Sequence, residues 1–127
     1  MSEYVLDASA VLALLNREKG AEIVESILPR SVISTVNLAE VVTRLVAIGM
    51  PEGEIRETLS LLGLNSVSFE KEDAFEAGLL HGETKGYGLS LGDRACLALA
   101  KSRKAKAVTA DQIWKNIDED IEIELIR

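Results

Sequence analysis

Four acidic side chains stand at points of the sequence where a carboxylate could take part in chemistry. Asp7 ends a short apolar run near the N-terminus, and Asp93 opens an apolar helical stretch. Glu40 lies within another apolar helical pattern, and Asp111 follows a further apolar run. Carboxylates are preferred ligands of Mg²⁺ and Mn²⁺, and two such ions about 3.5–4 Å apart can activate water and stabilise a leaving oxygen. If the four acids converge, they indicate a divalent-metal site suited to phosphodiester chemistry.

Each acid also has a purely structural explanation. The two acids that follow apolar runs could cap the next helix. Glu40 could pair with Arg44 four residues later, an interaction that stabilises a helix by roughly 0.3–0.5 kcal/mol. Ser90 and Asp93 have the spacing of a capping box, and an acid in the first turn complements the helix dipole. A cap and a ligand are compatible roles, because a capped helix start can hold a carboxylate in a fixed direction.

Short apolar runs alternate with amphipathic segments along the chain, and this alternation predicts an α/β fold with a mostly parallel sheet and helices on both faces. We expect strands at 4–6, 31–34, 65–69, 106–109 and 121–126. We expect helices at about 9–15, 20–28, 35–48, 51–62 and 71–83, from about 90 onward, and a short one at 112–116. Ser9 is a candidate cap of the first helix, as is Asp7.

This arrangement would bring the four acids to one edge of the sheet. Ligands of open α/β sheets bind in the crevice at the carboxyl ends of the strands, and the acids follow strands or open helices there. Asp93 lies farther along the chain from the strand before it, because two helices separate the third and fourth strands. The loop at 82–88 must carry the chain back to that edge.

Composition limits the class of protein. The chain has 127 residues, 47% of them hydrophobic and 28% charged, which is typical of one globular domain spanning 1–127. No run approaches the roughly 18 apolar residues of a membrane span, and residues 1–4 lack the basic start of a secretory signal. Cys96 is the only cysteine, so we interpret it as a core residue of a protein from a reducing compartment, the cytoplasm.

The formal charge of −7 argues against a simple basic nucleic-acid binder, but not against a nuclease whose acids hold metal. It also suits a basic protein partner. His81 is the only histidine, which leaves few candidates for a zinc site or a serine triad. The basic run at 101–106 is explained most simply as the C-terminus of a helix, and Trp114 as a packing residue.

The chain resembles the PIN-domain family, and within it the VapC toxins of toxin–antitoxin pairs. The resemblance covers nearly the whole chain and depends on four segments in this order: Tyr4-Val5-Leu6-Asp7-Ala8-Ser9, Asn37-Leu38-Ala39-Glu40-Val41, Leu91-Gly92-Asp93-Arg94-Ala95-Cys96-Leu97-Ala98-Leu99-Ala100 and Val108-Thr109-Ala110-Asp111. It implies a three-layer α/β/α sandwich with a mostly parallel five-stranded sheet. It also implies a Mg²⁺- or Mn²⁺-dependent endoribonuclease that cuts single-stranded or looped RNA.

The resemblance assigns roles to the acids. Asp7 and Asp93 would be the main metal ligands, and Glu40 and Asp111 would complete the site or hold metal-bound waters. Two hydroxyl groups, those of Ser9 and Thr109, would support the site by hydrogen bonds. Family members are usually homodimers, and an antitoxin typically packs against the helix hairpin at about 36–62.

One departure from the family pattern bears on the number of metal ions. Many relatives have a further acid two residues after the position of Asp111, where this chain has Ile113. A one-metal mechanism is therefore an alternative to a two-metal mechanism. The same departure, with the acidic balance, favours a second hypothesis, a PIN-like binding module that acts through a partner. A phosphoacceptor domain would need an acceptor aspartate after the third strand, where the chain has Phe69-Glu70-Lys71.

Overall fold

Five short parallel strands form the centre of the fold in a computed structural model that describes residues 3–117 and 120–127. The strands are β1 (Tyr4–Leu6), β2 (Ser31–Ser34), β3 (Asn65–Val67), β4 (Lys106–Thr109) and β5 (Ile123–Leu125). Their order in the sheet is β3-β2-β1-β4-β5. The chain moves outward in one direction from β1 to β3 and in the other from β4 to β5. The strand order therefore reverses between β1 and β4, which is where ligands of such sheets bind.

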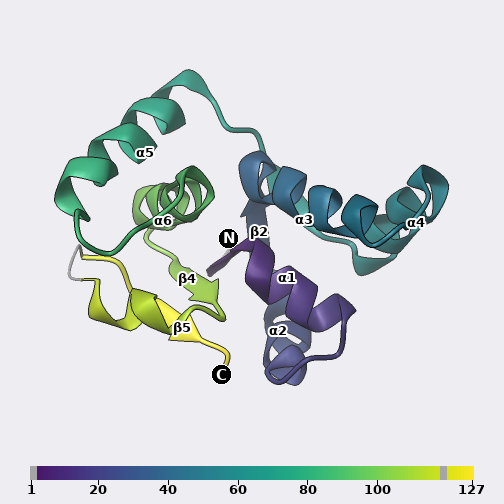
Figure 1. Cartoon of the computed structure of the whole chain (residues 1–127). Helices are drawn as coiled ribbons and strands as arrows, with labels where there is room; N and C mark the ends of the chain where they lie inside the picture. Colours follow the sequence, from purple (N-terminus) through teal and green to yellow (C-terminus); the bar gives the residue numbers. More distant parts are fainter. Residues whose placement is uncertain (1–2, 118–119) are drawn as a thin grey trace.

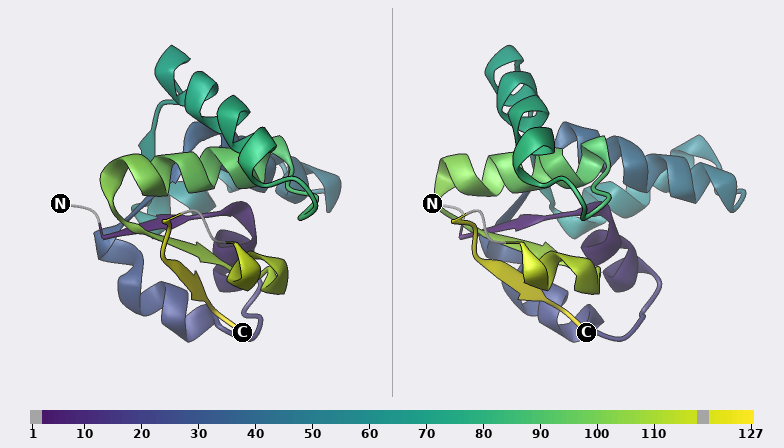
Figure 2. Two further views of the ribbon diagram at one scale, coloured as in Figure 1. Left: turned by 90° about the vertical axis from the view of Figure 1, so that its left-hand side faces the viewer. Right: turned by 60° about the vertical axis from the view of Figure 1, so that its left-hand side comes forward.

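Helices cover both faces of this sheet. They are α1 (Ala8–Leu15), α2 (Ala21–Ile27), α3 (Thr35–Ala47), α4 (Glu52–Leu62), α5 (Lys71–Glu83) and α6 (Leu91–Arg103), with the 3₁₀ turns η1 (Leu28–Arg30) and η2 (Gln112–Asn116). The views in Figures 1 and 2 show α1 and α2 on one side of the sheet and α6, with α5 outside it, on the other. The α3–α4 hairpin extends away from the sheet (Figure 1). The predicted three-layer α/β/α sandwich is confirmed, and all four strand pairings are parallel.

Successive strand residues face two separate cores. Val5, Val32 and Ala107 belong to the core under α5 and α6. Their neighbours belong to the core under α1, α2 and α3; these are Leu6, Ile33 and Val108. Because the inner strands are buried on both faces, their sequences are continuous apolar runs rather than alternating ones. Trp114 and Cys96 are fully buried, as predicted.

One of the two candidate caps of α1 is used, and two strands are shorter than predicted. Asp7 is the cap of α1: its backbone is extended and its carboxylate accepts the Ala10 N–H. Strand β3 ends at Val67, because the Phe69 N–H donates to the Thr35 hydroxyl at 3.0 Å and leaves the ladder. The segment after β4 is a 3₁₀ turn, and β5 is shorter than expected.

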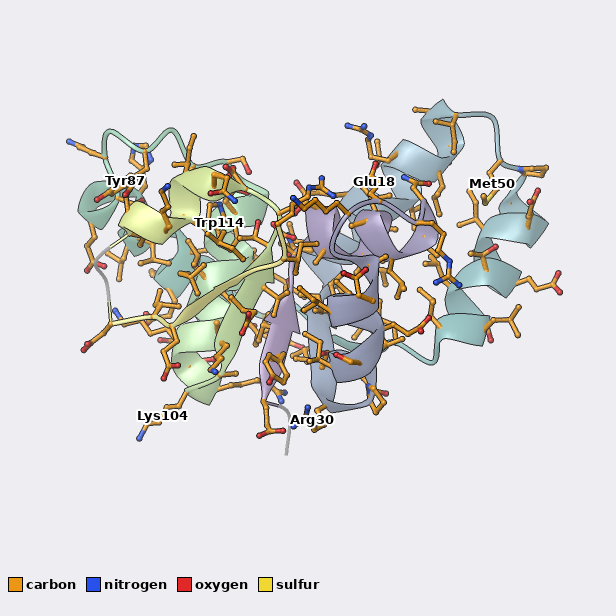
Figure 3. All side chains as sticks on the ribbon, turned by 90° about the horizontal axis from the view of Figure 1, so that it is seen from below. Glu18, Arg30, Met50, Tyr87, Lys104 and Trp114 are labelled. Atoms are coloured by element: carbon orange, nitrogen blue, oxygen red, sulfur yellow. The ribbon has the colours of Figure 1, made fainter. Side chains whose placement is uncertain are left out.

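The basic run at 101–106 lies at the far end of α6 from Asp93. Helix α6 has 13 residues, so with a rise of about 1.5 Å per residue its two ends are roughly 18 Å apart. Figure 3 shows Lys104 and Arg30 at one end of the molecule and Trp114 and Glu18 toward the other. The structure thus agrees with the simpler interpretation of this run, as a helix C-terminus.

Within residues 3–117 and 120–127, no helix has the combined length and apolarity that a membrane crossing requires. The N-terminal segment considered above for a secretory signal includes residues 1–2, which lie outside the described part of the chain.

Candidate functional site

Asp7 is the most deeply buried of the four acids, with 5% of its surface exposed, and it stands at the point where the strand order reverses. Its Oδ1 atom accepts the Ser9 hydroxyl at 2.7 Å and the Ala10 N–H at 2.9 Å. Its Oδ2 atom accepts the Thr109 hydroxyl at 2.6 Å. These bonds join the end of β1 to the end of β4 through one carboxylate.

The two hydroxyl groups around Asp7 both donate and accept hydrogen bonds. A hydroxyl has one hydrogen, and both Ser9 and Thr109 donate theirs to the carboxylate. As acceptors they take backbone N–H groups from the segment after β4: that of Ala110 at 2.9 Å and that of Asp111 at 3.0 Å. The carboxylate is therefore held in one orientation by groups whose own partners are fixed.

Burial raises the pKa of Asp7 from its ordinary value of 3.8 to about 6. The hydrogen bonds from Thr109, Ser9 and Ala10 favour the charged form and lower the pKa, but they offset only part of the cost of burial. The negative charge of Asp93 raises it further. No salt bridge to Asp7 occurs among the described residues. This buried carboxylate consequently lacks a cation.

The first turn of α6 presents Asp93. Ser90 caps the helix: its hydroxyl accepts the Asp93 N–H at 3.1 Å, and Asp93 Oδ2 accepts the Ser90 N–H at 2.9 Å. The predicted capping box is therefore confirmed. The preceding loop is tied to the C-terminal part of the chain, since the Tyr87 hydroxyl donates to the Asn116 carbonyl at 2.8 Å. This loop returns the chain to the edge of the sheet where the other acids lie, as the sequence predicts.

Glu40 lies against that same helix start. The Asn37 side-chain amide donates to Glu40 Oε1 at 2.9 Å and to the Gly92 carbonyl at 2.9 Å. A Cβ atom built on Gly92 would fall 2.5 Å from the Cδ and Oε1 atoms of Glu40. No ion pair between Glu40 and Arg44 is present in the described part of the chain, so the pairing considered from the sequence is not formed.

Cys96 lies within reach of the charges of three of the acids. Its thiol is fully buried one turn after Asp93, and its pKa is raised well above the ordinary value. Burial is the main cause, and the negative charges of Asp7, Asp93 and Glu40 add to it. These three carboxylates, from the end of β1 and from α3 and α6, therefore lie on the same side of the protein as this thiol.

Asp111 stands at the rim of this group. Its Oδ1 atom accepts the Ile113 N–H at 3.0 Å and caps η2, and its own N–H donates to the Thr109 hydroxyl at 3.0 Å. Asp111 is thus connected to Asp7 through Thr109, while its carboxylate is directed to its own turn. Hydrogen bonds through Thr109 thus connect Asp7 with the backbone of Asp111, and Glu40 lies against the helix start that contains Asp93.

The donor set fits a hard divalent cation, since it offers carboxylate and hydroxyl oxygens and includes a buried carboxylate without a counter-charge. Across 3–117 and 120–127, no group of three or more His, Cys, Asp or Glu side chains is placed so that it could already hold a metal ion. Ionised carboxylates repel one another without a cation, and here they accept hydrogen bonds from their own helix starts.

Two residues of the site have no role in the sequence interpretation, although the motifs contain them. Asn37 is 1% exposed and joins Glu40 to α6, and Gly92 provides the space in which the Glu40 carboxylate lies. The signal for Asn37 was its position three residues before Glu40, on the same helical face. The contact with Gly92, 55 residues away, has no local signal.

Grooves lie on both sides of α3, and one of them reaches Glu40. One of about 590 Å³ lies between α1 and α3 and is lined by Ser9, Leu12, Glu40 and Arg44 among others. The larger, of about 820 Å³, lies within the α3–α4 hairpin and against β2; its apolar lining includes Leu38, Val42, Ile55 and Leu59. The first groove adjoins the acids, whereas the second opens on the side of α3 that includes Leu38 and Val42.

The fold and its acidic edge define an α/β protein with clustered carboxylates at the strand-order reversal. The family model of the PIN domain matches residues 4–120, and the chain belongs to the PIN-domain family. No curated protein matches the chain at a significant level.

Solved structures of similar fold agree with this assignment. "Crystal structure of DNA bound VapBC from Salmonella typhimurium" is matched with a TM-score of 0.79 and 21% identity over 100% of both chains. VapBC-1 from nontypeable Haemophilus influenzae is matched with a TM-score of 0.73 and 23% identity over 97% of both chains. A toxin–antitoxin complex from Klebsiella pneumoniae is matched with a TM-score of 0.72 and 22% identity, over 94% of this chain and 99% of the other. At these identities the likeness concerns the fold.

Proposed function

We propose that this protein is a metal-dependent endoribonuclease, the toxin of a type II toxin–antitoxin pair, which hydrolyses phosphodiester bonds of single-stranded or looped RNA. The observation that carries the proposal is the buried Asp7 carboxylate, without a cationic partner, beside Asp93 and Glu40 at the strand-order reversal. Membership of the PIN-domain family and the fold shared with VapBC structures support it.

Asp7 and Asp93 would be the main ligands of Mg²⁺ or Mn²⁺, and Glu40 and Asp111 would complete the site. When bound, the metal ion would lower the pKa of a water and stabilise charge on the phosphate. Ser9 and Thr109 orient Asp7 through its two oxygens. The capping box holds the backbone of Asp93, and the buried apolar residues below the acids keep bulk water from that side.

The substrate strand is proposed to lie in the groove between α1 and α3, which adjoins Glu40. Arg44, on the same wall, is exposed and forms no ion pair within the described ranges 3–117 and 120–127. A guanidinium there could bind a phosphate next to the one that is cleaved. This would place one positive charge beside a strongly negative site.

An antitoxin is proposed to occupy the α3–α4 groove. The similar solved structures are described as toxin–antitoxin complexes, and this groove of about 820 Å³ is large and mostly apolar. Such a groove fits the apolar face of a partner helix. The net charge of −7 would favour a partner with a basic segment that reaches the acids.

A homodimer is proposed to form through α5 and the start of α6. Three large apolar side chains there are strongly exposed: Phe75 at 58%, Leu79 at 65% and Leu91 at 53%. Exposed apolar patches of this kind are typical of interfaces. A second copy of the chain would cover them.

A second candidate function is a PIN-like binding module that acts through its partner. Two observations favour it: the carboxylates of the described residues are not placed to hold a metal ion, and Ile113 stands where many relatives have an acid. Calorimetry distinguishes the two functions. A binding module would show no uptake of Mg²⁺ or Mn²⁺ and would bind a small basic protein tightly.

The cleavage assay tests the first function. Purified protein should cut single-stranded RNA with Mg²⁺ or Mn²⁺, and EDTA should abolish the activity. Cleavage that persists in EDTA would contradict metal dependence. Absence of cleavage with both metals, together with absence of metal binding, would favour the binding module.

A further inference from the structure

We propose that Asn37 is a positioning residue: its side-chain amide joins the Glu40 carboxylate to the first turn of α6 and so sets the metal affinity of the site. We refer to Asn37, Glu40 and Gly92 as the α3–α6 clamp. The inference builds on the proposed function, because it concerns the same acids, but it assigns a role to a residue that is not itself an acid.

One nitrogen atom makes both bonds of the clamp. Nδ2 of Asn37 has two hydrogens, and they are donated to Glu40 Oε1 and to the Gly92 carbonyl, each at 2.9 Å. Asn37 is 1% exposed, so water does not compete for these bonds. The amide therefore fixes a distance between α3 and α6 that the two helices do not fix by local structure.

The second of these bonds also fixes the backbone of Asp93. The Gly92 carbonyl and the Asp93 N–H belong to one peptide unit. The carbonyl accepts from Asn37, and the N–H donates to the Ser90 hydroxyl at 3.1 Å. Because this unit is held at both ends, a change at Asn37 would be transmitted to Asp93 as well as to Glu40.

The orientation of the amide follows from its surroundings. If the oxygen and nitrogen of Asn37 were exchanged, an amide oxygen would face a carboxylate and a carbonyl, and three acceptors would meet without a donor. In the orientation present, Oδ1 is buried and has no partner among the described residues. An apolar residue of the same shape would remove that unsatisfied atom, but it would also leave Glu40 Oε1 and the Gly92 carbonyl without their donor, so the amide is needed for both of these acceptors.

A neutral donor suits this position. A lysine or arginine could also hold Glu40, but it would neutralise the carboxylate and compete with a cation. The amide holds the carboxylate and leaves its charge intact. Gly92 completes the arrangement, since a side chain there would collide with the Glu40 carboxylate.

The test compares metal affinity with folding stability. Asn37→Leu keeps the branched shape but removes both donors. We expect its Mn²⁺ affinity, measured by calorimetry, to fall by 10- to 100-fold, as is usual when a group that orients a metal ligand is lost. The thermal midpoint of the metal-free variant should fall as well, because the Gly92 carbonyl and Glu40 lose their donor. Mn²⁺ affinity therefore separates the two roles, since a purely structural asparagine would give a lower midpoint with unchanged Mn²⁺ affinity in the folded variant.

A second pair of variants tests the clamp from the other helix. Gly92→Ala should weaken Mn²⁺ binding by at least 10-fold, because the methyl group displaces Glu40. In a protein that already has Glu40→Ala, adding Gly92→Ala should not lower the Mn²⁺ affinity further. Gly78→Ala on α5 is the matched control, since a Cβ there meets no atom within 4 Å, and its Mn²⁺ affinity should equal that of the wild type.

The outcomes separate the clamp from the function it serves. If the wild type binds Mn²⁺ and cleaves RNA, while Asn37→Leu and Gly92→Ala bind Mn²⁺ as tightly, the clamp alone is refuted. If the wild type binds no Mn²⁺, the proposed function fails and the clamp with it. If Asn37→Leu does not fold, the Mn²⁺ affinities of Gly92→Ala and Gly78→Ala test the clamp instead, and equal affinities would refute it.

Discussion

At the scale of single residues, Asp7 explains why the site would take a cation. Its carboxylate is buried and close to the negative charge of Asp93, and these two effects raise its proton affinity more than its three hydrogen bonds lower it. A proton is the cation available to it in the metal-free protein. A divalent ion would replace that proton, and metal affinity would therefore increase with pH through the range around 6.

The same shift predicts how stability depends on pH. The folded pKa of Asp7 is about 6, above the ordinary 3.8, so the folded state binds the proton more tightly than the unfolded state. The stabilisation of the folded state by this proton is fully present below about pH 4 and is lost as pH rises through 6. Metal-free wild type should lose about 2–3 kcal/mol relative to Asp7→Asn between pH 4 and pH 7.

Urea unfolding in EDTA at several pH values measures this difference. Glu57→Gln, which changes an exposed carboxylate on α4, serves as the control and should follow the wild type. Stability curves of wild type and Asp7→Asn that run parallel across this range would show that burial does not shift Asp7.

The sequence did not reveal the roles of Asn37 and Gly92, because the bond between them joins residues that are far apart in the chain. The capping box of Ser90 and Asp93 was predictable because its spacing is local. The bond from Asn37 to Gly92 was not, since it depends on how closely α3 approaches α6. The choice between Asp7 and Ser9 as the cap of α1 was likewise open in the sequence, because both precede apolar residues, and the backbone shows that Asp7 is the cap.

At the scale of elements, the sheet order explains how distant segments form one site. Strands β1 and β4 are neighbours, with Leu6 beside Val108, so the residues that follow them meet at one edge. The strands were predictable because buried parallel strands are short apolar runs between helices. Their order was not, and neither was the loop between α5 and α6, whose path depends on tertiary contacts such as that of Tyr87 with Asn116.

The groove between α1 and α3 gives a prediction about substrate binding. Arg44→Gln should lower kcat/KM for single-stranded RNA by about tenfold, a value on the order of one charge-assisted hydrogen bond. The slope of log(kcat/KM) against log(salt) should also decrease by about 0.7, the change expected for one lost phosphate contact. Assays at several salt concentrations measure both quantities.

Arg56→Gln is the matched control for this assay. Arg56 is an exposed arginine on α4 that pairs with Glu52, away from the acids, and its loss should leave both quantities unchanged. Equal effects of the two substitutions would indicate a general charge effect and contradict an RNA path beside Arg44.

At the scale of the whole molecule, two exposed apolar surfaces lie on different helices. One is the α3–α4 groove, and the other is formed by Phe75, Leu79 and Leu91 on α5 and α6. In Figure 1 the α3–α4 hairpin and α5 project from different sides of the sheet. The two surfaces could therefore bind an antitoxin and a second copy at the same time.

Matched charge substitutions should separate these surfaces. Leu59→Glu, in the α3–α4 groove, should prevent co-purification with a small DNA-binding antitoxin encoded beside this gene and leave RNA cleavage intact. Leu79→Glu on α5 should keep the antitoxin but weaken self-association, measured by analytical ultracentrifugation. An antitoxin that still binds and inhibits the Leu59→Glu protein would contradict the assignment of the groove.

The central claim is that the acids at the strand-order reversal support metal-dependent RNA hydrolysis, and cleavage by Asp93→Asn tests it most directly. An asparagine can still accept the Ser90 N–H, so the cap of α6 and the fold should persist, as circular dichroism can verify. We predict that the wild type cleaves single-stranded RNA with Mn²⁺ and that the folded variant loses at least about 100-fold in rate. Equal rates for the two proteins, or wild-type cleavage without metal, would contradict the claim.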